Sequence, residues 1–99
     1  MSNFSMDKFG GLFDAVLKLK NKEECEKFFE DVCTIKGLED VMQRLEVAGL
    51  LKEGLNYQEI SKKTGASTAT ISRVNKCLVY GRGGYDIVLG KKESKDGND

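Results

Sequence analysis

The stretch GASTATISRVNKCL, residues 65–78, places a glycine and several small, hydroxyl-bearing residues before an isoleucine, an arginine and a lysine. These features suit a helix-turn-helix, because its two helices cross steeply through a tight turn and glycine takes positive φ without strain. Gly65 therefore predicts the turn of a helix-turn-helix over about 57–80. Ile60, Ile71 and Val74 stand at offsets that point inward between the two helices.

The remaining positions of the motif face outward, and their chemistry suits DNA. Small side chains let a helix approach base edges in the major groove, hydroxyls can bond to bases, and cations suit phosphates. Either Ser67 or Thr68 also serves as a cap of the second helix, expected over 68–80. The predicted DNA-binding residues are Gln58, Lys62, Ser67, Thr68, Ala69, Ser72, Arg73 and Lys76.

Charge is distributed unevenly along the chain, although its 99 residues carry 16 basic and 16 acidic side chains. Residues 1–51 hold seven basic and ten acidic side chains, net −3, whereas residues 52–82 hold six basic and two acidic ones, net +4. The positive part coincides with the predicted motif, which favours a polyanionic partner. No apolar run is long enough for a bilayer and the N-terminus lacks a secretory signal, so we expect a cytoplasmic protein without a membrane partner.

The sequence offers little for catalysis or metal binding. It has no histidine, and its three cysteines, Cys25, Cys33 and Cys77, have no C-x-x-C spacing. The sequence therefore indicates neither a cluster of metal ligands nor an activated nucleophile. We expect no enzyme activity, no metal and no cofactor.

Apolar residues elsewhere recur at helical spacing, and the chain has no proline. This predicts a helix over 9–19, a second from Lys22, and a third that Thr34 caps and that runs to about residue 53. The third helix has two apolar stripes, which is typical of a helix central to a core or a subunit interface. For 85–89 two alternatives stay open: a short last helix, which we favour, and a hairpin wing around the preceding glycines.

These residues resemble the Trp repressor family. The stretch at 65–78 resembles its recognition-helix region, and TIKGLEDVMQRLEVAGLLKEG, residues 34–54, resembles the helix that precedes it. The run YQEISKKTGASTATISR is typical of the YerC/YecD-type branch of that family. The resemblance covers about 10–80 and implies an all-α, intertwined helical homodimer with a helix-turn-helix in each subunit, which reads a palindromic operator in double-stranded DNA.

The resemblance also implies a pocket for a small-molecule effector. The threonine and the two arginines that line the corepressor site in this family match Thr34, Arg44 and Arg73. Val74 replaces a glycine and Cys77 replaces a serine, so a branched side chain fills the place of a ligand ring and a thiol is a weaker donor. We therefore expect a pocket at these five residues that does not respond to tryptophan, with any effector being another small molecule.

The prediction is a single helical domain over 1–90, followed by a flexible polar tail over 91–99. Its function is sequence-specific DNA binding by a transcriptional regulator, a repressor. The alternative is a helical protein–protein interaction module that keeps the packing of the helix-turn-helix without reading DNA. The zero net charge and the acidic first half favour this alternative.

Overall fold

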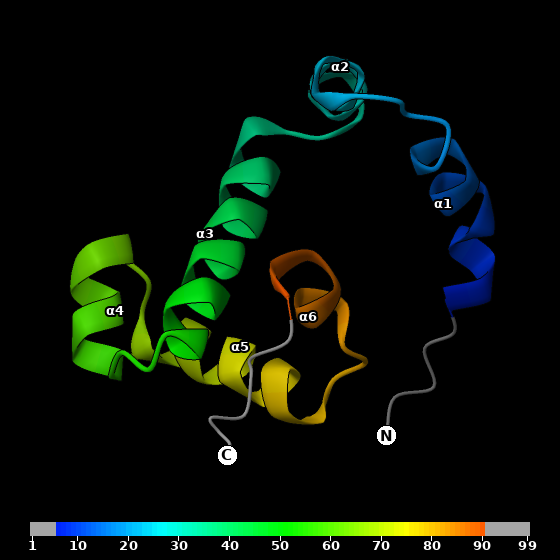
Figure 1. Ribbon diagram of the computed structural model, residues 1–99. Coiled ribbons are helices and arrows are strands. Elements are labelled where there is room, and N and C mark those ends of the chain that lie inside the picture. Colours follow the sequence, from blue (N-terminus) through cyan, green and yellow to red (C-terminus); the bar gives the residue numbers. More distant parts are fainter. Residues whose placement is uncertain (1–5, 91–99) are drawn as a thin grey trace. The chain divides into compact units, whose positions relative to one another are not determined.

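The computed structural model describes residues 6–90 and consists of helices throughout this range (Figure 1). A 3-10 helix, η1, is followed by six α-helices, and residues 6–90 contain no strand. The elements are η1 (Met6–Phe9), α1 (Gly10–Val16), α2 (Lys22–Val32), α3 (Ile35–Lys52), α4 (Tyr57–Thr64), α5 (Thr68–Tyr80) and α6 (Gly84–Leu89). The predicted all-α class is therefore confirmed, and 85–89 forms the short helix rather than a wing.

The chain divides into two compact units, one ending at Leu38 and the other beginning at Glu39. The expected single domain over 1–90 stays a prediction, and the expected flexible tail over 91–99 lies outside the described residues. No helix in the described part of the chain is both long and apolar enough to cross a membrane.

The N-terminal unit is made of short helices, and η1, α1 and α2 contain no buried side chain. The predicted first helix over 9–19 ends earlier, at Val16, because the following amides of Lys18 and Leu19 bond to carbonyls three residues back. Asn21 caps α2, its side chain accepting a hydrogen bond from the Glu24 amide at 2.9 Å. These helices thus form from local signals while leaving their apolar faces uncovered.

The long helix α3 begins and ends as its terminal residues predict. The Thr34 hydroxyl accepts a hydrogen bond from the Gly37 amide at 3.0 Å, as an N-cap does. At the other end Gly54 has φ 93°, and the Leu55 amide donates to the Leu50 carbonyl at 3.2 Å, which is the bond of a Schellman motif. The second half of α3 is thereby directed into the turn that leads to α4.

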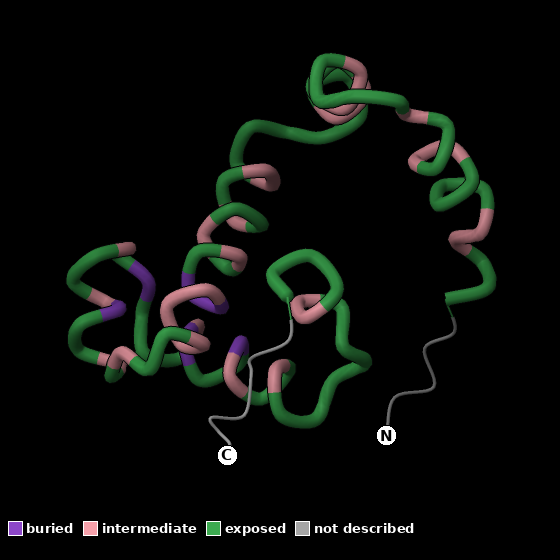
Figure 2. The backbone as a smooth tube through the Cα atoms, viewed as in Figure 1, coloured by how far each residue is buried: buried purple, intermediate pink, exposed green. Residues whose placement is uncertain are grey.

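The core of the C-terminal unit gathers where α4, α5 and the turn between them meet the second half of α3 (Figure 2). Each valine or isoleucine side chain in this core contributes about 1.5–3 kcal/mol when fully buried. The core therefore holds the helix-turn-helix against α3. Its buried residues are Val47, Ala48, Ile60, Ala66, Ile71 and Val74.

Candidate nucleic-acid interface

The first helix of the motif, α4, has well-formed caps at both ends. Asn56 and Glu59 form a capping box, in which each side chain accepts a hydrogen bond from the other residue's amide at 2.9 Å. At the C-terminal end Gly65 has φ 77°, and its amide donates to the Ser61 carbonyl at 2.8 Å. Gly65 therefore makes the left-handed turn that the sequence predicts.

The turn itself is tied to both helices of the motif and to α3. The Thr64 hydroxyl donates to the Ile60 carbonyl at 2.8 Å and accepts from the Ala66 amide at 3.1 Å. Gln43 of α3 donates from Nε2 to the Thr64 carbonyl at 3.2 Å. Ser67 then caps α5 by accepting a hydrogen bond from the Thr70 amide at 3.1 Å. These bonds fix the angle at which α5 leaves the turn.

The packing inside the motif confirms three sequence predictions and adds one residue. Ile60 and Ile71 are fully buried, and Val74 is 2% exposed. Ala66, which sequence reasoning missed, is also 2% exposed and sits in the turn. Its position directly after the glycine that ends α4 is a place where an apolar contact commonly accompanies the cap, and this signal could have identified it.

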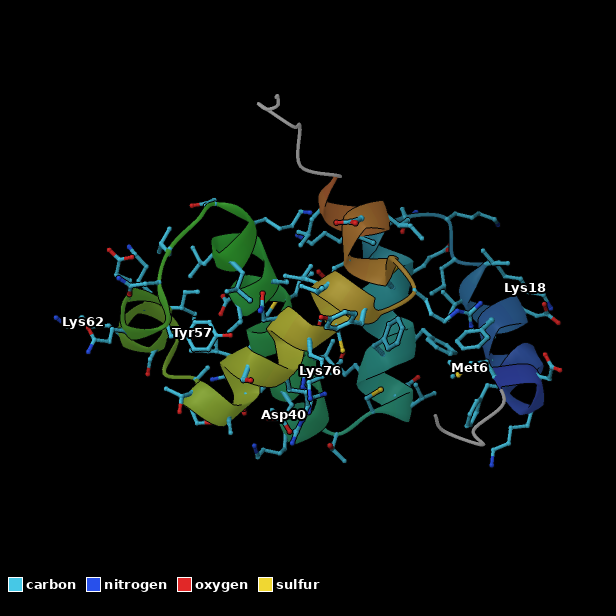
Figure 3. The ribbon with its side chains drawn as sticks, turned by 90° about the horizontal axis from the view of Figure 1, so that it is seen from below. Met6, Lys18, Asp40, Tyr57, Lys62 and Lys76 are labelled. Atoms are coloured by element: carbon cyan, nitrogen blue, oxygen red, sulfur yellow. The ribbon has the colours of Figure 1, made fainter. Side chains whose placement is uncertain are left out.

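All of the predicted DNA-binding residues are exposed. On α5 they occupy one face, opposite the face of Ile71 and Val74 given 3.6 residues per turn. Figure 3 shows Lys62 on α4 pointing away from α5, whereas Tyr57 lies on the inner side of α4 and packs against the core. We call these exposed, predicted DNA-binding residues together the reading face; they are Gln58, Lys62, Ser67, Thr68, Ala69, Ser72, Arg73 and Lys76.

The reading face is positively charged. Arg73 and Lys76 lie on α5, and Lys62 lies on α4 beside a further cation, Lys63. None of these four side chains forms an ion pair with another residue in the described range 6–90. The nearby acid Glu59 is engaged in the capping box. Unpaired cations beside small hydroxyl-bearing residues are suited to a phosphate backbone and the base edges next to it.

Of the residues expected to form an effector pocket, those in the C-terminal unit are not all brought together. Thr34 caps α3 in the N-terminal unit, Arg73 lies on the reading face, and Val74 lies in the core. Only Arg44 and Cys77 line a common cavity, of about 620 Å³, between α3, α5 and α6. The other residues of its lining are Val41, Leu45, Gly81, Arg82, Gly84, Tyr85 and Val88.

Within this cavity Tyr85 has a perturbed phenol. Burial raises its pKa above the ordinary value of 10.0; the Cys77 thiol adds to the rise, and the Arg44 guanidinium opposes it. The phenol is therefore protonated at neutral pH and available as a hydrogen-bond donor. Sequence reasoning missed the contribution of α6 to this cavity, because the packing of α6 against α3 and α5 is not a local property.

A metal centre is not apparent in the described residues, since no three His, Cys, Asp or Glu side chains between 6 and 90 gather as ligands would. The fold and the site define an all-helical protein with a helix-turn-helix whose second helix exposes a small, cationic face. Residues 7–93 match the family model described as Trp repressor protein. The chain belongs to the Trp repressor family.

Three relatives are similar to this chain. The uncharacterized protein YerC of Bacillus subtilis (strain 168) is 54% identical over 78 residues, covering 79% of this chain and 75% of YerC. A TrpR-like protein from Eubacterium eligens ATCC 27750 has a crystal structure with a TM-score of 0.80 and 52% identity, covering 89% of this chain and 94% of that one. The crystal structure of a candidate Trp repressor from Staphylococcus aureus also gives a TM-score of 0.80, at 42% identity, covering 88% of this chain and 92% of the other. These similarities support the YerC-type branch that the sequence resembles.

Proposed function

We propose that this protein is a sequence-specific, DNA-binding transcriptional regulator, a repressor that reads a palindromic operator through α5. The observation that carries the proposal is the reading face: every residue predicted to contact DNA is exposed, and those on α5 lie on the side opposite its buried residues. Membership of the Trp repressor family supports the same conclusion.

The chemistry of the reading face suggests how the work is divided among its residues. Ser67, Thr68, Ala69 and Ser72 are small enough for α5 to enter the major groove, where their hydroxyls can bond to base edges. Arg73 has a planar guanidinium that suits a phosphate or a guanine. The lysines of the reading face, Lys62 and Lys76, are suited to neutralising phosphates. The small residues would then determine which DNA sequence is recognised, and the cations would supply most of the affinity.

A homodimer is part of the proposal. The helices of the N-terminal unit have no buried side chain of their own, and large apolar residues are exposed, including Leu17 at 82% and Ile35 at 72%. A chain of 99 residues with so small a core gains stability by covering such surface. A second copy would cover it and, by its two-fold symmetry, place two recognition helices on a palindrome.

We further propose that tryptophan is not the effector. Val74 is 2% exposed inside the core, at the position where the resemblance implies a glycine beside the ligand ring. A branched side chain held there by its neighbours leaves no room for an indole. If DNA binding responds to a small molecule, that molecule differs from tryptophan.

The alternative function is a helical module that binds another protein. The acidic N-terminal half and the exposed apolar side chains favour it, because both are compatible with a protein partner. In that case substitution of Arg73 and Lys76 by alanine would have no effect on DNA retention. The two functions therefore differ in one measurable property of the reading face.

Selection of bound fragments from random DNA, with the oligomeric state measured by light scattering, tests the proposal. We expect the dimer to enrich a palindromic consensus, since two reading faces related by a two-fold axis contact two half-sites. Enrichment of no sequence by the folded dimer would support the protein-binding module instead. A non-palindromic consensus bound by a monomer would contradict the dimeric part of the proposal.

A further inference from the structure

A hydrogen bond from the middle of α3 holds the turn of the helix-turn-helix. Nε2 of Gln43 donates to the carbonyl oxygen of Thr64 at 3.2 Å, and both residues are half-buried. Thr64 is the last residue of α4, and the last carbonyls of an α-helix have no partner within the helix. The side chain of Gln43 therefore satisfies, from another helix, a carbonyl that the end of α4 leaves open.

Thr64 connects this bond to the start of α5. Its hydroxyl donates to the Ile60 carbonyl and accepts from the Ala66 amide, so one residue is bonded to α4, to the turn and to α3. Ser67, which caps α5 and belongs to the reading face, follows three residues later. A shift of Thr64 relative to α3 would therefore displace the start of the recognition helix.

The core beneath the motif keeps it on α3 but restrains its direction less than a hydrogen bond does. Val47 lies one helical turn after Gln43, on the same side of α3, and packs in the core with Ile60 and Ile71. Burial of apolar surface has no preferred direction, whereas a hydrogen bond weakens steeply when its donor and acceptor are misaligned. The bond from Gln43, beside this core, thus adds the directional restraint.

The same part of α3 also exposes apolar side chains. Val41 is 60% exposed and Met42 is 51% exposed, directly before Gln43 in the sequence. In the proposed homodimer, exposed apolar surface of this kind is what a second copy covers. Within one turn of α3, the chain therefore presents a surface suited to a second copy and a bond to the turn that precedes the recognition helix.

We propose that Gln43 is a positioning residue: through Thr64 it fixes the direction of α5 relative to α3, and in the dimer this fixes the spacing of the two half-sites that are read. The inference rests on the proposed function, since half-sites presuppose a dimer that binds a palindrome. One inserted base pair moves a half-site by about 3.4 Å and turns it by about 35° along the duplex. Two recognition helices held in fixed directions cannot follow that change, so Gln43 confers selectivity for spacing rather than for bases.

The test compares the wild type with Gln43→Met, which removes the donor and keeps a long side chain of high helix propensity. Binding is measured to the operator selected from random DNA, to the same operator with one base pair added between its half-sites, and to a single half-site. The variant should lose about three- to tenfold of the preference for the selected spacing, the effect of one intramolecular hydrogen bond. Its affinity for the single half-site should be unchanged, because the reading face is intact.

Gln58→Met is the matched control, because it makes the same chemical change at the other glutamine of the chain, which lies on the reading face. It should weaken binding to the single half-site and leave the preference for spacing as in the wild type. An unchanged spacing preference in Gln43→Met would overturn the inference. So would an equal loss of that preference in both variants, since Gln43 would then have no special part in positioning.

Residual dipolar couplings of the backbone amides, measured on the full chain without DNA, report the direction of α5 relative to α3. One alignment tensor should fit both helices in the wild type, and the couplings of α5 should depart from that fit in Gln43→Met. Unchanged couplings in this variant would reject the inference and leave the proposed function standing. Altered couplings in a protein whose wild type binds no DNA would reject the proposed function and leave the positioning by Gln43 standing. The two failures can therefore be told apart.

Discussion

Lys52 and Asp86 form an ion pair across the C-terminal unit, with the Nζ of Lys52 at 2.5 Å from Oδ1 of Asp86. Their side chains are 16% and 32% exposed, whereas those of the Lys27–Glu23 pair in α2 are 74% and 75% exposed. Since α6 contains no buried residue, this partly buried pair is one attachment of α6 to α3, beside the packing of Tyr85 against the core.

Asp86→Asn should loosen α6 and lower the free energy of unfolding by about 1–2 kcal/mol, since a partly buried charged hydrogen bond loses its charge. Urea unfolding and amide exchange of residues 84–89 measure the two effects. Glu23→Gln is the control, because it removes a pair that is exposed and 3.6 Å apart, and it should change stability by less than about 0.5 kcal/mol. Equal effects of both substitutions would show that α6 is held by other contacts.

Gly65→Ala should destabilise the protein by about 1–2 kcal/mol, because Gly65 has φ 77° and an L residue is strained there. Gly49, within α3, is the matched position: a Cβ at either glycine would meet no atom within 4 Å, so the two differ in backbone conformation. Gly49→Ala should be neutral or should stabilise by about 0.5–1 kcal/mol. Thermal or urea unfolding measures the change in stability of both variants. A Gly65→Ala variant as stable as the wild type would argue against a rigid turn.

Alkaline pH should weaken the fold through Tyr85. The pKa of Tyr85 is raised above 10.0 in the folded state, so the native state holds the phenolic proton more tightly than the unfolded chain does. The free energy of unfolding therefore falls as the pH rises from about 10.0, the pKa in the unfolded chain, through the higher folded-state pKa. Between about pH 9 and about pH 11 the free energy of unfolding should decline less in Tyr85→Phe than in the wild type. Parallel curves for the wild type and Tyr85→Phe would contradict this role of Tyr85.

Titration of L-tryptophan into the protein should give no heat of binding, because Val74 is held in the core where an indole would need space. A binding event with zero enthalpy is detected by following the amide resonances of residues 71–77 in the same titration, and these should not move. Micromolar binding that increases operator affinity would show that the core opens around Val74 and that the tryptophan response is retained.

The parts of the structure that depend on local chemistry were predictable from the sequence, and those that depend on distant packing were not. Gly65, Asn56 and Thr34 act as the turn and cap residues that their types indicate, because a cap bonds within a few residues of itself. The cavity could not be predicted in this way, since the residues that line it, such as Arg44 and Tyr85, are far apart in the sequence and share a cavity only when α6 packs back toward α3. Val74 was correctly expected to point inward, but its place in the core separates it from the cavity.

The reading face illustrates the same distinction. Its exposure follows from helical periodicity once Ile71 and Val74 are placed inside, so the sequence was sufficient to predict it. Whether its cations contact DNA depends on the partner and stays a prediction.

The most direct test of the central claim is the salt dependence of DNA retention by the wild type and by the double variant Arg73→Ala/Lys76→Ala. Lys18→Ala/Lys22→Ala removes the same charge from the N-terminal unit and serves as the control. The logarithm of the wild-type affinity should fall with the logarithm of salt concentration by about 0.9 for each phosphate neutralised, and the double variant should bind more weakly with a shallower slope while remaining dimeric. A flat salt response in the wild type, or identical binding by all three folded proteins, would contradict the claim that this protein reads DNA.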